Sequence, residues 1–319
     1  MHLLIPYAYA PSEACDRALL ETPLPALGRL LARMEVSQRV ECDEYDLNSP
    51  YERTLARELG LHAPDGCLPF AARWALHDGV NVGPRCWGLM TPVHLHMGTD
   101  QFTMMDPDLL GLTEDESRAF LQAVSVLFVE EGFHLAWGAP TRWYLSHDML
   151  TDLSCASLDR VIGRNIDAWI PDHSRARLIR RLQNEVQMLL HAHPLNEARE
   201  ARGLPVINSF WLSGCGELQA EKPSDTLEVH ELLRDGLLQV DMAAWTAAWA
   251  SLDAEVLAPA VKALETGELQ ALTLCGERQA VTLKPRRVLG ALAQWRERWQ
   301  LWRKPEWPQG EVLRFLQQL

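Results

Sequence analysis

The segment from residue 193 to residue 216, HPLNEAREARGLPVINSFWLSGCG, concentrates side chains that could bind an anion. Asn196, Arg199 and Asn208 are multidentate polar residues placed around one turn. An arginine offers a planar fork of N–H donors that matches a carboxylate or a phosphate group. The spacing therefore indicates a candidate ligand-binding turn.

The same segment also fits a plain connection between a helix and a strand. Asn196 can cap a short helix that Gly203 ends, and residues 206–212 can then enter a sheet. Gly214 and Gly216 would allow a tight turn after that strand. The residues alone leave both interpretations open.

Two further arginines could join the same anion site. Arg142 begins an expected strand over 142–146, and Arg164 follows a glycine in an expected loop. If Arg142, Arg164 and Arg199 converge, they form a clamp for a phosphate or carboxylate group. The alternative is three separate surface salt bridges.

A second group of residues carries side chains that commonly bind metal ions. His94 and His96 lie two residues apart, a spacing that puts two imidazoles on one face of a strand. Asp100 and His147 could complete such a set. Histidines that are hydrogen-bonded within a strand are the commoner case, so no metal or other cofactor is expected.

The elements that must position these residues alternate along the chain. Hydrophobic spacing and capping signals predict helices and strands, with Thr113 and Glu116 at the spacing of a capping box. Two strands are expected on either side of residues 138–140. This order favours an α/β architecture with a sheet covered by helices. The predicted strands are 2–8, 133–137, 142–146, 206–212 and a pair over 269–283, and the predicted helices are 24–34, 51–61, 68–77, 114–131, 174–191, 241–264 and 286–301.

Composition narrows the class of partner. The chain has 319 residues, 47% of them hydrophobic, and a net charge of −13, which disfavours nucleic acid and anionic membranes as partners. No apolar run reaches the length of a membrane span. The seven cysteines occur singly, without a CxxC pair, as in a protein from the reducing cytoplasm.

One predicted helix carries a stripe of tryptophans. Trp295, Trp299 and Trp302 recur at helical spacing within and just beyond 286–301. Basic residues between them could indicate nucleic-acid binding, but a core face or a subunit interface is the simpler interpretation. A homo-oligomer built through this helix is therefore one hypothesis.

The segment 193–216 resembles a segment of the archaeal-type, cofactor-independent phosphoglycerate mutases. VHLHMGTDQ and GFHLAWGAPTRWYLSH are similar to that family's smaller domain, in the same order, so the resemblance covers residues 86–216. Over the whole length the chain resembles the RpfE-type regulatory proteins. The resemblance implies an alkaline-phosphatase-like sheet covered by helices, with a smaller inserted α+β domain. The implied parts are 1–85 and 208–319 for the core and 86–207 for the insertion. It also places Arg142 on the small-domain strand that carries an arginine in the mutases.

The sequence departs from that family where the metals would bind. The resemblance implies an aspartate directly after the first strand, but Pro6 and Tyr7 stand there and no carboxylate precedes Glu13. Residues 217–319 contain only one histidine, His230. A two-metal centre is therefore not expected, although two metals are what phosphoryl transfer of this kind uses.

The resulting expectation is a non-catalytic, phosphoglycerate-mutase-like protein of the cytoplasm with a regulatory role. It would bind a small anionic metabolite or a protein partner. One alternative is an active metal-dependent phosphomutase or phosphatase, and another is an oligomeric interaction module. The residues expected to bind the ligand are Arg142, Arg164, Asn196, Arg199 and Asn208.

Overall fold

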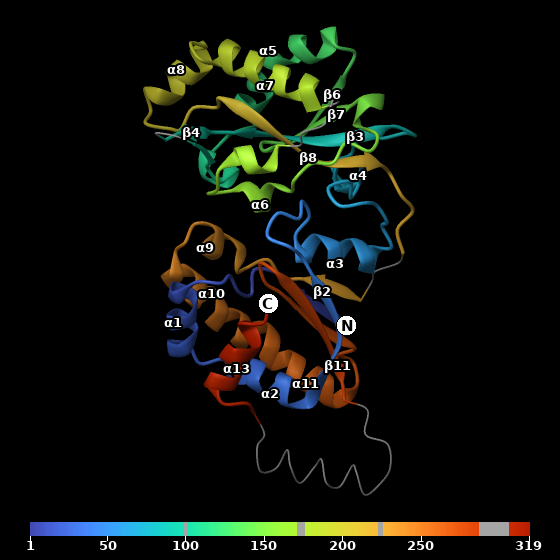
Figure 1. Ribbon diagram of the computed structural model, residues 1–319, viewed down its shortest axis with the longest axis vertical. Coiled ribbons are helices and arrows are strands. Elements are labelled where there is room, and N and C mark those ends of the chain that lie inside the picture. Colours follow the sequence, from blue (N-terminus) through green and yellow to red (C-terminus); the bar gives the residue numbers. More distant parts are fainter. Residues whose placement is uncertain (99–100, 171–175, 223–225, 287–305) are drawn as a thin grey trace, which may run out of the picture. The chain divides into compact units, whose positions relative to one another are not determined.

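The computed structural model divides the chain into two compact units (Figure 1). It describes residues 1–319 except 99–100, 171–175, 223–225 and 287–305. Unit 1 comprises Met1–Glu44, Pro50–Glu58 and Pro223–Leu319, and unit 2 comprises Tyr45–Ser49 and Leu59–Lys222. The chain thus passes between the units near residues 45–59 and 223, not at residues 86 and 208 as the sequence suggested.

Unit 1 contains a five-stranded mixed sheet in the order β2–β11–β10–β1–β9. The interior strand β1 runs parallel to both of its neighbours, β10 and β9, whereas β11 is antiparallel to β10 and to β2. The carboxyl ends of β10, β1 and β9 therefore lie along the same edge of the sheet. The strands are β1 His2–Ile5, β2 Met34–Glu41, β9 Leu227–Val229, β10 Ala271–Cys275 and β11 Gln279–Pro285.

Helices cover both faces of this sheet because successive strand residues point to opposite sides. Leu3 and Ile5 pack into a core with Trp245 and Trp249, and Leu4 packs on the other face against α3. The helices are α1 Glu13–Glu21, α2 Pro25–Arg33, α3 Pro50–Leu59, α9 Arg234–Leu238, α10 Met242–Leu252, α11 Ala258–Thr266 and α13 Gln309–Leu316.

A single π-helical turn, Asp253–Leu257, joins α10 to α11. The buried Asp253 carboxylate accepts hydrogen bonds from the backbone N–H groups of Ala26 and Leu27 at 3.0 and 2.8 Å. It therefore caps α2, whose own preceding residue, Leu24, has no side-chain acceptor. The helix predicted over 241–264 is thus interrupted by this turn, and Pro259 lies in the first turn of α11.

Unit 2 contains a four-stranded antiparallel sheet in the order β6–β7–β3–β8 and a separate β4–β5 hairpin. The strand β3 is buried along its whole length. The strands are β3 Cys86–Val93, β4 Leu95–Met97, β5 Phe102–Met104, β6 His134–Ala139, β7 Arg142–Ser146 and β8 Ser209–Glu217.

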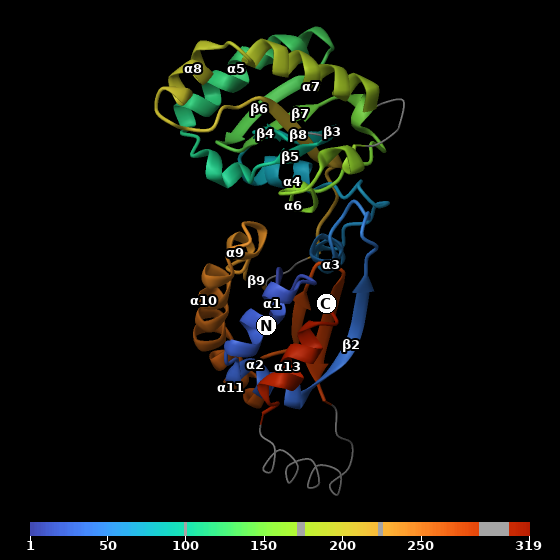
Figure 2. The same ribbon diagram turned by 60° about the vertical axis from the view of Figure 1, so that its left-hand side comes forward.

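Helices α5 and α7 lie over one face of this sheet, and α4 lies on the other (Figure 2). Phe120 and Leu182 pack with Met90 on the first face, and Ala71 packs with Trp87 on the second. The helices are α4 Phe70–His77, α5 Glu114–Glu130, α6 Leu158–Val161, α7 Ala176–Leu190 and α8 Pro194–Glu200, and the 3-10 turns are η1 Pro107–Leu110, η2 Asp148–Leu150 and η3 Ile166–Trp169.

The predicted elements are confirmed in most of the described chain, including the capping box of Thr113 and Glu116. The prediction for segment 193–216 is wrong in two places. Asn196 lies inside α8, which begins at Pro194 with His193 as its cap. Gly214 and Gly216 belong to β8 and do not form a turn after it. The predicted helix over 286–301, with its tryptophans, lies outside the described residues apart from Arg286.

The architecture is mixed α/β, with an α+β second unit. No helix in the described residues is both long enough and apolar enough to cross a bilayer.

Candidate functional site

The carboxyl end of β1 is a candidate site, because open α/β sheets bind ligands at such strand ends. Tyr7 has a φ of 60°, a left-handed conformation that is strained for an aromatic residue. Its carbonyl accepts a hydrogen bond from Trp245 Nε1 at 3.1 Å. The tilted ring of Tyr51 lies 6.1 Å from that of Tyr7, measured between centroids, and its hydroxyl donates to Glu231 at 2.8 Å. Two aromatic rings therefore fill this strand end.

These residues do not fit a divalent metal ion. Hard cations and zinc bind carboxylate, imidazole or thiolate ligands, whereas Pro6 and Tyr7 occupy the position directly after β1. Burial, followed by the neighbouring Glu231 carboxylate, raises the pKa of Tyr51, so its phenol stays neutral. The first metal ligand that the mutase resemblance implies has no counterpart here.

Arg199 is fully buried, and protein groups accept hydrogen bonds from all three of its nitrogens. Its Nε donates to the Pro205 carbonyl at 2.8 Å, Nη1 donates to Glu116 at 3.1 Å, and Nη2 donates to the Leu110 carbonyl. Glu116 also pairs with the exposed Arg202. The guanidinium thus joins α8, the start of α5 and the turn before it.

The charge of Glu116 is stabilised within this arrangement. Burial works to raise the pKa of its carboxyl group. The hydrogen bonds from Arg202 and from the Thr113 backbone, with the charge of Arg199, outweigh burial and lower the pKa. Glu116 is therefore an anion already bound by the arginine that was expected to bind a ligand.

Asn196 and Asn208 also act on the backbone of their own unit. Asn196 Nδ2 donates to the carbonyls of Leu190 and Ile207 at 2.9 and 2.7 Å, and its Oδ1 accepts the Ile207 N–H at 2.9 Å. Asn208 exchanges two hydrogen bonds with the backbone of Leu95, at 2.7 and 2.8 Å. Both asparagines therefore satisfy backbone groups of unit 2.

Arg142 has a different environment, at the exposed start of β7. Its Nε and Nη2 donate to the two carboxylate oxygens of Asp78 at 2.9 and 2.8 Å, and Tyr144 donates to the same carboxylate at 2.6 Å. This bidentate pair is the strong geometry for an arginine and a carboxylate. The side chain of Arg142 is 44% exposed, and its Nη1 makes no hydrogen bond within the described residues.

The Arg142–Asp78 pair shifts both partners toward their charged forms. The hydrogen bond from Arg142 is the main reason that the pKa of Asp78 is lowered. Gly138 is required beside the pair, since a Cβ there would lie 2.4 Å from Asp78 Oδ2.

Arg164 lies in the loop between α6 and η3, with its guanidinium carbon 5.9 Å from the centre of the Trp169 ring. Arg160 approaches the same ring at 5.2 Å. The three arginines of the expected clamp thus have separate contacts: Arg142 with Asp78, Arg164 with Trp169, and Arg199 with Glu116.

The histidines expected as possible metal ligands have backbone partners. His94 Nδ1 lies 2.9 Å from the carbonyl of Val206, and His147 Nδ1 accepts the N–H of Met149 at 2.9 Å. His96 is in β4, and Asp100 lies outside the described residues. Within the described part of unit 2, no three His, Cys, Asp or Glu side chains bring ligand atoms within 4.8 Å of one another.

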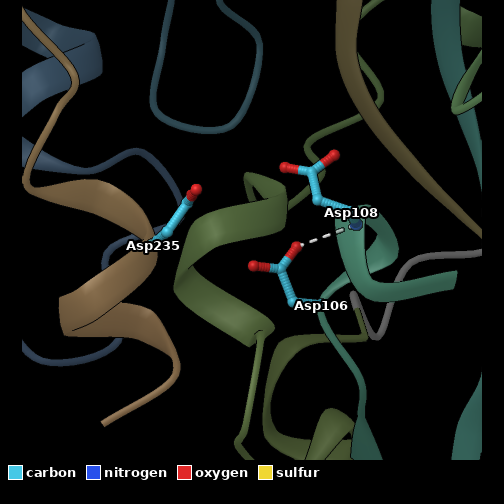
Figure 3. A group of neighbouring side chains, drawn as sticks. All are labelled: Asp106, Asp108 and Asp235. Atoms are coloured by element: carbon cyan, nitrogen blue, oxygen red, sulfur yellow. Dashed lines mark hydrogen bonds between the residues drawn. The ribbon is translucent and has the colours of Figure 1, made fainter. Parts of the chain in front are cut away.

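Two carboxylates in unit 2 lie close together at the start of η1. Figure 3 shows Asp106 and Asp108, with the Asp106 carboxylate accepting the backbone N–H of Asp108 at 3.1 Å. This bond caps η1. Asp235, the third residue drawn, belongs to α9 of unit 1.

Sequence reasoning missed Asp78 and the second role of Glu116. Asp78 ends α4 and is 64 residues from its partner Arg142, so no local spacing connects them. Glu116 was recognisable as part of a capping box, but its pairing with Arg199 spans 83 residues. Only the fold brings these charges together.

No family model and no curated protein matches this chain, whereas the solved structures that are similar to it include two from archaea. One is a cofactor-independent phosphoglycerate mutase from Thermoplasma acidophilum DSM 1728, with 14% identity, 88% of each chain covered and a TM-score of 0.37. The other is the PH0037 protein from Pyrococcus horikoshii, with 12% identity, 89% of this chain and 87% of that chain covered, and a TM-score of 0.41. The chain is therefore similar to phosphoglycerate-mutase-like structures. The narrower resemblance to RpfE-type regulatory proteins has no support in these comparisons.

Proposed function

We propose that this protein is a non-catalytic binding protein with a regulatory role, and that its ligand is a small phosphate- or carboxylate-bearing metabolite. The observation that carries the first part is the carboxyl end of β1. The strained Tyr7 backbone, held by Trp245, and the neutral Tyr51 phenol occupy the position where a metal-bound nucleophile centre would begin.

Arg142 is the residue best placed to contact an anion. Of the five residues expected from the sequence, Asn196 and Arg199 are buried and use their hydrogen-bonding groups on the protein. Arg142 combines an exposed side chain with a guanidinium that Asp78 holds in one orientation. An oriented arginine loses less conformational freedom on binding than a free one. Arg164 is the second candidate contact.

The carboxylate of Asp78 affects how strongly Arg142 can bind an anion. Its carboxylate neutralises much of the charge that Arg142 would offer, so the parent protein binds anions weakly and the pair tunes the affinity. Removing the negative charge while keeping the shape, as in Asp78→Asn, should strengthen anion binding. Arg142→Ala should abolish it, and Arg142→Lys should retain part of it.

Isothermal titration with inorganic phosphate and with 3-phosphoglycerate tests the binding. The proposal expects binding by the parent, none by Arg142→Ala, and at least a threefold tighter complex with Asp78→Asn. Circular dichroism of each variant checks that it is folded. If the parent binds neither anion, or if Arg142→Ala binds as the parent does, Arg142 is not the anion contact.

The same protein, supplied with Mn²⁺ or Zn²⁺, tests the absence of catalysis. We expect no isomerisation of 3-phosphoglycerate and no release of phosphate above the rate in buffer. Turnover that disappears with a chelator would refute the non-catalytic assignment and establish the metal-dependent enzyme instead. Binding and turnover are measured independently, so each half of the proposal can fail alone.

A further inference from the structure

Three contacts to cysteine sulfur atoms hold the loop of residues 151–155 in unit 2. Each contact joins one side chain of the loop to a cysteine from a different segment of the unit. The contacts attach the loop, TDLSC, to the sheet at two points and to the segment before α4 at one. The contacts are Thr151 Oγ1 to Cys86 Sγ at 3.1 Å, Ser154 Oγ to Cys67 Sγ at 3.4 Å, and Cys155 Sγ to Cys215 Sγ at 3.8 Å.

The last of these contacts brings two thiols together from distant parts of the chain. Cys155 is 6% exposed and Cys215 is 1% exposed, and 60 residues separate them. A disulfide bond has an S–S distance of about 2.05 Å, so the two sulfur atoms need to approach by roughly 1.8 Å. Rotation of the side chains and a small shift of one backbone segment supply such a movement.

The two backbone segments differ in their freedom to shift. Cys215 lies in β8, which is paired along β3, and the sulfur packs over Gly88, where an added Cβ would lie 3.1 Å from it. Cys155 lies in an irregular loop outside the sheet, and within the described residues its backbone is held by one hydrogen bond, from its N–H to the Gly66 carbonyl at 2.9 Å. The sulfur atoms therefore approach through rotation of the two cysteine side chains and a small shift of the loop, and the approach breaks no strand pairing.

We propose that Cys155 and Cys215 are a modification site, at which a hydroperoxide oxidises the two thiols to an intramolecular disulfide. The Cys155 thiolate attacks one peroxide oxygen, the O–O bond breaks, and a sulfenic acid and water form from hydrogen peroxide. The Cys215 sulfur then attacks the Cys155 sulfur, the S–O bond breaks, and a second water leaves with the proton of Cys215. Two thiols and one peroxide thus give one disulfide and two waters.

The surroundings of the pair assign the two roles. Cys155 lines a cavity of about 30 Å³ together with Leu153, Trp169 and Trp211, which is room for one or two molecules of the size of water. Cys215 does not line it. The contact with Cys155 and complete burial raise the pKa of Cys215, so this sulfur is held as a thiol until its neighbour has been oxidised. Cys155 is the attacked residue, and Cys215 resolves it.

A metal ion would be the other use of two neighbouring thiols, and the geometry disfavours it. Zinc in structural sites takes four ligands. Within the described part of unit 2, no third sulfur, imidazole or carboxylate lies within 4.8 Å of both sulfur atoms. A neutral disulfide also suits the apolar surroundings of Cys215 better than a charged thiolate complex.

Peptide mapping of the folded, full-length protein after hydrogen peroxide treatment tests the proposal. Alkylation should label two fewer cysteines per chain than in the untreated protein, and dithiothreitol should restore both. Trypsin releases Cys155 in residues 143–160 and Cys215 in residues 203–234, because Lys222 precedes a proline. These two peptides should be recovered joined.

Three variants complete the test. Cys155→Ala and Cys215→Ala should each keep their remaining thiols in the folded protein, whereas Cys15→Ala, which removes a buried cysteine of unit 1, should still lose two. A crosslink of either peptide to residues 58–73 or 86–118, which hold Cys67 and Cys86, would overturn the proposed pair. So would retention of all seven thiols. The mapping of the parent decides the matter even if a variant fails to fold.

Discussion

Replacing Arg199 with methionine should destabilise unit 2 strongly, even in the absence of any ligand. The side chain is fully buried and donates to the carbonyls of Leu110 and Pro205 and to the carboxylate of Glu116. Methionine keeps most of the aliphatic volume but leaves these three acceptors without their donor. Breaking a buried ion pair by removing one partner costs about 3–5 kcal/mol.

Arg202, in the turn directly after α8, provides a matched control. It pairs with the other oxygen of Glu116, but its side chain is 51% exposed. Exposed ion pairs contribute only about 0–1 kcal/mol, so Arg202→Met should have a small effect. The two variants therefore remove an arginine from the same partner, Glu116, but differ in how deeply that arginine is buried.

Scanning calorimetry of the two variants measures the difference. A loss of about 3–5 kcal/mol corresponds to a decrease of roughly 6–20 °C in the Tm of a unit of this size, and Arg202→Met should lower it by no more than about 4 °C. If Arg199 were instead held available for a ligand, its replacement would leave the Tm of the unliganded protein nearly unchanged. Equal, small shifts in the two variants would refute the structural role assigned to Arg199.

Three other predictions concern packing and protonation. Gly138→Ala should destabilise unit 2 by about 1–3 kcal/mol in urea titrations, because its Cβ meets Asp78, while Gly310→Ala in α13 meets nothing within 4 Å and should not destabilise unit 1. Arg142 lowers the pKa of Asp78, so the pair stabilises the folded state fully above an ordinary aspartate pKa of about 3.9. This stability is lost as the pH falls through the lower pKa of the folded state. Asp78→Asn should remove that part of the acid dependence. Burial lowers the pKa of His2 below about 6.5, so the folded state binds fewer protons than the unfolded state. Unit 1 should therefore lose stability as the pH falls below that value. His2→Gln should flatten the dependence of stability on pH, and an unchanged dependence would contradict the assignment.

Local signals in the sequence were enough to predict most of the elements. The capping box of Thr113 and Glu116 and the apolar spacing of α5 depend on neighbours within a few residues, and the structure confirms both. The strand pair over 269–283 was predicted for the same reason, and it corresponds to β10 and β11. The cap that Asp253 supplies to α2 comes from 226 residues away, and no local pattern could reveal it.

The candidate site was harder to predict, because residue type does not distinguish a ligand contact from an internal one. Arg199 and Arg142 have the same donors and were placed in the same expected clamp. In the structure one is buried against backbone carbonyls and the other is exposed beside a carboxylate. The difference depends on what the fold places opposite each guanidinium, which is a property of tertiary structure.

The polar residues of segment 193–216 provide hydrogen-bonding partners for the backbone around them. Residues 201–208 connect α8 to β8 without regular structure, so groups such as the Pro205 carbonyl and the N–H and carbonyl of Ile207 need partners other than a helix or a strand ladder. Arg199 and Asn196 supply those partners at Pro205 and Ile207. Without these two side chains the Pro205 carbonyl and both backbone groups of the buried Ile207 would lose their partners, and each unsatisfied buried group costs about 1–3 kcal/mol. A dense set of asparagine and arginine residues beside glycine and proline can therefore indicate a buried irregular connection as readily as a ligand site, and the exposed fraction of the side chain is the measurement that separates the two.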